Sequence, residues 1–94
     1  MSVFKNKKVV NSLKKKGFTI PPGNHHHVYH EFWHKGKLVT STYTSHGKGD
    51  INDYLIGQMS KQCLLSKVEF KELINCPLTI EKYLKLLKDR GALD

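Results

Sequence analysis

Apolar positions in the first quarter of the chain change from a helical spacing to an extended one. Residues 6–16 predict an amphipathic helix with lysines around it. Its apolar stripe is formed by Val9, Val10 and Leu13, at i, i+1 and i+4. The glycine that follows is a common end of a helix. Residues 18–20 then predict a short strand at a sheet edge, because the two prolines after it have no N–H to donate.

Residues 25–45 predict a β-hairpin. The first strand, 25–33, is rich in aromatic and β-branched side chains, and residues 37–45 return as a Val-, Thr- and Tyr-rich strand. Lys35 and Gly36 between them suit a tight turn, since glycine readily adopts a positive φ. Neither face of the first strand is purely apolar. The pattern therefore leaves open which face of the hairpin is buried.

A loop over residues 45–49 leads into a predicted helix at about 51–62. Asp50 is the expected N-cap of this helix. The residues expected on its buried face follow a spacing of i, i+3, i+4 and i+8: Ile51, Tyr54, Leu55 and Met59.

Two short helices complete the predicted order. Ser66 and Glu69 form a capping-box pattern before the first of them, and Thr79 caps the second, residues 80–90. Their expected inward side chains are Phe70, Leu73, Ile74, Tyr83, Leu84 and Leu87. The expected fold is α+β, with the order α-β-β-β-α, a three-stranded antiparallel sheet and two additional C-terminal helices. We expect one domain over residues 1–94.

Positive charge is concentrated in the first half of the chain. Residues 1–48 hold nine lysines and one acid, a net charge of +8, whereas residues 49–94 are neutral overall. This distribution is typical of a protein that binds a polyanion such as RNA or DNA. It is equally typical of a solvated lysine surface that aids solubility. Lysine in place of arginine favours contact with phosphate over bidentate reading of bases.

The apolar runs, the N-terminal residues and the cysteines indicate in which surroundings the protein acts. No apolar run approaches the roughly 20 residues of a membrane span, and the N-terminal residues do not resemble a signal peptide. Cys63 and Cys76 fit neither a CxxC motif nor a zinc-site spacing. We expect both to be reduced, half-buried thiols of a cytoplasmic protein, with one disulfide between them as the alternative.

Several short motifs, in this order, resemble the HicA family of bacterial and archaeal toxins. The motifs are a Lys-rich first helix ending in KKKGF, the step GNHH at the start of the hairpin, the loop SHG and a helix ending in KQCLLS. The resemblance covers about residues 5–66, and residues 67–92 resemble an extension of some archaeal-like members. It rests on motif order and not on long identity.

This resemblance implies a fold similar to a double-stranded-RNA-binding domain (dsRBD). It also implies the activity of the family, which is endonucleolytic cleavage of mRNA by the toxin of a toxin–antitoxin system that acts in stress responses. A HicB-like antitoxin would cover the site. No cofactor and no membrane partner are expected.

The catalytic histidine of the family would lie in the step after Gly23. Alignment on this glycine favours His26 and then His25, while alignment back from the hairpin turn allows His27. Histidine suits metal-free RNA cleavage because it exchanges protons near neutral pH. Outside this resemblance, the three histidines are more simply explained as a polar strand start. The expected nucleic-acid-binding residues are Lys7, Lys8, Lys14, Lys15, Lys16, Lys48 and His46, the last also a candidate second acid–base group.

Two other interpretations remain open. A non-catalytic RNA-binding module would have the same basic half, and a protein-interaction domain could use it to bind an acidic partner. A metal site is not expected, because His26, His30 and His34 lie along one strand with about 13 Å between neighbours, too far apart for one ion.

Overall fold

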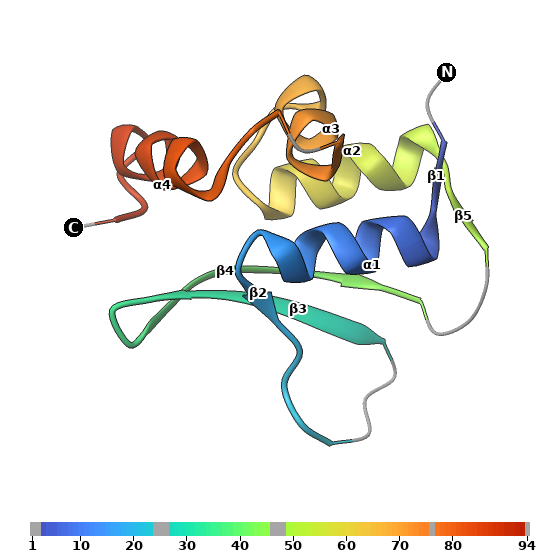
Figure 1. Ribbon diagram of the computed structural model, residues 1–94, viewed down its shortest axis with the longest axis horizontal. Helices are drawn as coiled ribbons and strands as arrows, with labels where there is room; N and C mark the ends of the chain where they lie inside the picture. Colours follow the sequence, from blue (N-terminus) through green and yellow to red (C-terminus); the bar gives the residue numbers. More distant parts are fainter. Residues whose placement is uncertain (1–2, 24–26, 46–48, 76, 94) are drawn as a thin grey trace.

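The chain folds into four helices and two antiparallel sheets within residues 3–23, 27–45, 49–75 and 77–93, which the computed structural model describes. Figure 1 shows the helices on one side of the larger sheet. The elements are β1 (Phe4–Lys5), α1 (Asn6–Lys15), β2 (Phe18–Thr19), β3 (Val28–His34), β4 (Lys37–Thr44), β5 (Asp50–Ile51), α2 (Asp53–Gln62), α3 (Lys67–Asn75) and α4 (Ile80–Asp89). The predicted α+β class and the three-stranded antiparallel sheet are confirmed.

Strand β3 is the centre of the larger sheet, whose order is β2-β3-β4. The predicted edge position of β2 and the predicted hairpin are therefore both confirmed. Lys35 and Gly36 form the turn with φ values of 51° and 78°, so both central residues have the positive φ of a type I′ turn. The inward face of β3 carries His30 and Phe32, while Trp33 points outward and is 49% exposed. This settles which face of the hairpin is buried.

Helix α2 begins later than the sequence pattern predicts. Asp50 is not its N-cap, because Asp50 and Ile51 form β5 and pair with β1. The cap is Asn52, whose side-chain oxygen accepts a hydrogen bond from the backbone N–H of Leu55 at 2.9 Å.

The side chains buried by α2 change accordingly. Ile51 is buried from the strand and not from the helix. With Ile51 outside the helix, the inward stripe starts at Ile56 and continues through Met59. The expected core positions Tyr54 and Leu55 are instead 69% and 43% exposed, and the prediction for these two residues is wrong.

Helices α3 and α4 follow the capping pattern closely. Glu69 N–H donates to the Ser66 hydroxyl, and Ser66 N–H donates to the Glu69 carboxylate, so the predicted capping box is confirmed. Thr79 caps α4 by accepting from the N–H of Lys82. The inward residues are as expected, with Leu84 only partly buried.

The hairpin and the C-terminal helices contribute to one hydrophobic core. The rings of Phe18, Phe32 and Tyr83 pack together, with centroids between 5.1 and 5.9 Å apart. The Tyr83 hydroxyl donates to the backbone oxygen of Cys63 at 2.9 Å, which satisfies a buried polar group. Helix α4 is therefore packed against the sheet through an aromatic cluster.

Cys63 is fully buried, in contrast to the half-buried thiol that we expected, and it is not in a disulfide. Burial raises the pKa of its thiol to about 12, so the side chain stays protonated and unreactive. The second cysteine, Cys76, lies outside the described residues.

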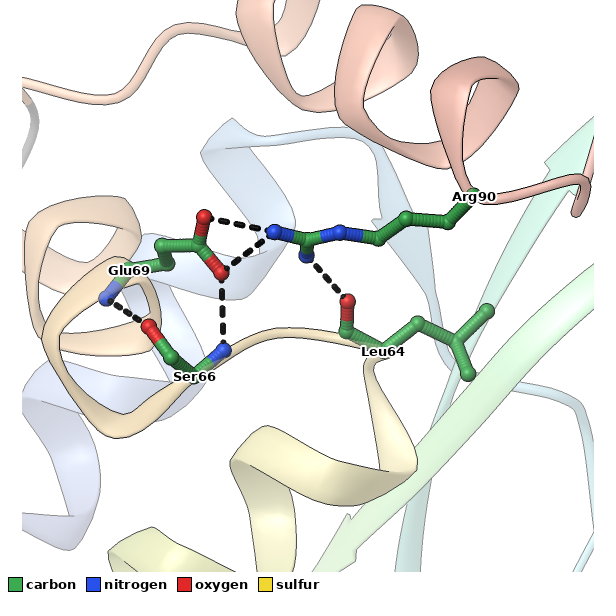
Figure 2. A network of polar contacts seen from close by, with 4 residues as sticks. All are labelled: Leu64, Ser66, Glu69 and Arg90. Atoms are coloured by element: carbon green, nitrogen blue, oxygen red, sulfur yellow. Dashed lines mark hydrogen bonds and ion pairs between the residues drawn. The ribbon is translucent and has the colours of Figure 1, made fainter.

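A polar network holds the end of α4 against the start of α3 (Figure 2). The Arg90 guanidinium donates to both oxygens of the Glu69 carboxylate, at 2.9 and 2.7 Å. It also donates to the backbone oxygen of Leu64 at 2.6 Å, beside the capping box of Ser66. Hydrogen bonds between oppositely charged groups, as in this pair, are stronger than those between neutral groups.

Replacing Arg90 by alanine is expected to lower the free energy of unfolding by about 1 kcal/mol, because the network spans two helices but is partly solvated. Chemical denaturation at low and high salt measures this loss, which should shrink as salt increases. Lys88→Ala, an exposed cation on α4, is the matched control. Equal effects of the two substitutions would show that the network does not stabilise the fold.

Candidate functional site

A cleft of about 320 Å³ lies where the open end of the β3–β4 hairpin meets the starts of α1 and α2. Its walls come from segments that are far apart in sequence: the first residue of α1, the ends of the hairpin strands, β5 and one side of α2. The β1–β5 pairing places α1 and α2 at this end of the hairpin.

Aromatic rings form the hairpin side of the cleft. His27, which directly precedes β3, and Tyr43 on β4 both line it, with ring centroids 4.7 Å apart. Tyr43 also lies opposite Tyr29 in the strand register, and their ring centroids are 5.8 Å apart. Cross-strand pairing thus holds the His27 ring in a cluster at the mouth of the hairpin.

Asn6, at the first position of α1, joins the helix to this end of the hairpin. Its side-chain N–H donates to the backbone oxygen of Ser45 at 3.3 Å, and its backbone N–H donates to that of Gly49 at 2.9 Å. Asn6, Ser45 and Gly49 all line the cleft. Two hydrogen bonds therefore fix the helix start to the segments that end and follow the hairpin, in the lining of the cleft.

Four of the sequence-predicted site residues lie outside the described residues: His25, His26, His46 and Lys48. Their described neighbours in the chain, His27, Ser45 and Gly49, all line the cleft. Of the three histidines that the alignments allow, the structure describes His27.

The predicted phosphate-binding lysines of α1 separate into two groups. Lys7, Lys14 and Lys15 are exposed on the helix. Lys8 donates to the side-chain oxygen of Asn75 at 2.8 Å, and Lys16 is buried and donates to the backbone oxygen of Leu78. The amine of Lys16 thus stabilises the packing of α1 against the segment before α4, which removes it from the exposed lysines.

None of the described lysines lines the cleft. The structure therefore does not bring the exposed lysines and the histidine cluster into one pocket. Lys7, which follows Asn6 in the first turn of α1, is next in sequence to a lining residue.

His30 is a core residue. Its side chain is fully buried, and its Nε2 lies 3.0 Å from the hydroxyl oxygen of Thr44. The other ring nitrogen, Nδ1, has no hydrogen-bond partner in the described part of the chain. Burial, with a smaller effect of the Lys14 charge, lowers the pKa of this imidazole to about 4. His30 is therefore neutral at physiological pH.

Sequence reasoning missed the residues that α2 contributes to the cleft. Tyr54, Leu55 and Gln58 line it, whereas the spacing placed the first two in the core. Asn52 was the available signal, since asparagine is as good an N-cap as the aspartate two residues earlier. In the helix that follows Asn52 the buried residues are Ile56, Met59 and Ser60, while Tyr54 and Leu55 are exposed.

Over the ranges described, no three histidine, cysteine, aspartate or glutamate side chains are grouped so as to hold a metal ion. No helix in the same ranges has the length and apolar character needed to cross a membrane. In comparisons with known proteins, the chain matches no protein-family model, no curated protein and no solved structure.

Proposed function

We propose that the protein is a HicA-like toxin, a metal-independent ribonuclease that cleaves mRNA and is neutralised by a HicB-like antitoxin. The observation that carries this proposal is the cleft at the hairpin mouth. It holds His27, the last of the three consecutive histidines, in a wall formed by distant segments of the chain. Clefts that gather a proton-exchanging side chain from such segments are the usual form of an active site.

The arrangement of the elements supports the proposal. A lysine-rich helix, three antiparallel strands and a further helix follow one another in the order that the resemblance implies, and the helices lie on one side of the sheet. We propose on this basis that the core is dsRBD-like. The exposed lysines Lys7, Lys14 and Lys15 supply a basic helix surface for phosphate.

The reaction that fits such a site is attack by a ribose 2′-oxygen on the adjacent phosphorus. A base removes the 2′-hydroxyl proton, the new P–O bond closes a cyclic phosphate, and an acid protonates the departing 5′-oxygen. An imidazole serves in either role. We assign one role to a histidine of the run 25–27, with His27 supported by the cleft and His26 and His25 by the resemblance. His30 is too deeply buried to take part.

A non-catalytic RNA-binding module is the second candidate. It is favoured by the separation of the exposed lysines from the cleft, because a cleavage site needs positive charge close to the reacting phosphate. Exposed rings such as Trp33 and Tyr43 would then stack on bases without any chemistry.

Induced expression distinguishes the two candidates. We expect the wild-type chain to stop growth and to fragment mRNA, and co-expression of its antitoxin to restore growth. Purified protein should cleave RNA in the presence of EDTA, since no metal takes part in the proposed reaction. If RNA stays intact in both assays but binds with a steep salt dependence, the chain is a binding module and the nuclease proposal is wrong.

A further inference from the structure

We propose that the cleft binds one unpaired nucleobase, so that the RNA recognised here is single-stranded. This inference rests on the proposed function and adds to it the class of substrate and a subsite that α2 forms. It follows from three properties of the cleft: exposed rings on facing elements, amide groups along one side and a lack of positive charge among the described lining residues.

The rings provide surfaces on which a planar base can stack. His27 and Tyr43 line the cleft from the hairpin. Tyr54 and Leu55 line it from the first turn of α2, with 69% and 43% of their surface exposed. Exposed apolar side chains that gather in one groove commonly mark a binding surface, and stacking on aromatic rings accepts any of the four bases.

The amides provide groups that match the edge of a base. Gln58 and Gln62 line the cleft from α2. The Thr42 hydroxyl donates to the side-chain oxygen of Gln62 at 2.6 Å, and this bond orients the amide. This bond uses the oxygen of the amide. The Nε2 group of Gln62, which carries two N–H donors, takes no part in it. An amide both donates and accepts, as the Watson–Crick edges of bases do.

The charged residues of the described lining favour a base over a phosphate as the group inside the cleft. The described lining contains one acidic residue, Asp50, and no lysine or arginine. Inside the cleft a phosphate would therefore have no cationic partner among the described residues, whereas a neutral base needs none. The backbone of the same nucleotide would then lie at the rim of the cleft, within reach of the proposed acid or base, and Lys7 follows the lining residue Asn6 on α1. A base in a duplex is already paired and stacked, so a strand must be unpaired to enter.

Binding of RNA oligonucleotides that carry 2′-O-methyl groups tests the inference apart from catalysis, because these strands cannot be cleaved through the 2′-oxygen. We expect the wild-type protein to bind a single strand at least about tenfold more tightly than a duplex of the same sequence. Tyr54→Ala should weaken single-strand binding by about tenfold and leave duplex binding unchanged, while Tyr54→Phe keeps the ring and the affinity.

Val68→Ala, which shortens an exposed apolar side chain on α3, is the control for general surface effects. Thermal unfolding should show that every variant is folded. Equal affinity for single strand and duplex, or single-strand affinity unchanged in Tyr54→Ala, would overturn the subsite. So would a Tyr54→Ala defect confined to binding of an antitoxin, which would make the cleft a protein-docking site. If cleavage is absent while single-strand binding is intact, the nuclease proposal is wrong and the base subsite stands.

Discussion

Acidification from pH 7 to pH 5 is expected to lower the free energy of unfolding by about 2 kcal/mol, and by about 3 kcal/mol at pH 4, because His30 cannot take up a proton in the fold. Burial lowers the pKa of this imidazole from 6.5 to about 4. Below pH 6.5 the unfolded chain therefore binds a proton that the folded chain does not. Stability falls with pH until about pH 4, where the folded state protonates as well.

Between pH 7 and pH 5 the effect of His30 on stability is separate from that of the paired carboxylates, which titrate in more acidic solution. The pKa values of Asp53 and Glu69 are lowered by contacts with Lys67 and Arg90. Their contribution to stability is thus present above their ordinary pKa values near 4 and is lost only in more acidic solution. Between pH 7 and pH 5 these two groups are ionised in both states.

Chemical denaturation at several pH values measures the effect, with His30→Gln as the matched variant. Glutamine does not titrate, and its amide is able to bond the Thr44 hydroxyl, the present partner of the ring. We expect the variant to lose about 2 kcal/mol less than the wild type over the same range. Parallel pH profiles of the two proteins would show that His30 is protonated in the fold near its ordinary pKa.

Local signals predicted much of this fold because they act within a few residues. The capping box of Ser66 and Glu69 and the turn at Lys35 and Gly36 each fix one boundary without help from the rest of the chain. Apolar stripes on α1, α3 and α4 then identified nearly half of the buried apolar side chains in the described part of the chain.

The burial of His30 could not be predicted from the same pattern. Both faces of its strand carry histidines and aromatic residues, so the alternation does not distinguish them. The inward face is decided by partners distant in sequence, which include Thr42 and Thr44 on β4 and the amide of Gln62 on α2. A buried histidine is tolerated here because a hydroxyl satisfies one of its nitrogens.

The candidate site was predicted in part for a similar reason. Residue type and motif order pointed to the histidine run and to the lysines of α1, and the structure brings His27 to a cleft. The other wall follows the two-residue β1–β5 pairing, in which Asp50 and Ile51 take part, so that α2 begins only after Asn52. Such a short pairing has no periodicity to detect, so its effect on the site was not visible in the sequence.

Replacing His27 by alanine is expected to slow cleavage of RNA by 100-fold or more, because removal of a general acid or base typically costs about 10²–10⁴ in rate. The expectation rests on its place in the cleft beside Tyr43. RNA affinity should fall far less than the rate, by about tenfold at most, because one stacking ring is lost while the exposed lysines stay in place. Rates come from single-turnover cleavage of a labelled strand in EDTA, and affinity from a 2′-O-methyl analogue of the same strand.

The same substitution at His25 and at His26 makes the test specific to position. The family resemblance favours His26 and then His25, whereas the cleft supports His27. The variant whose cleavage rate falls by about 100-fold or more, and far more than its affinity, decides between them. His34→Ala, at the far end of β3, should cleave like the wild type. Full activity in all three variants of the run would rule out a histidine there as acid or base. Equal losses in all three and in His34→Ala would indicate a general effect on folding, since unrelated positions share no role in proton transfer.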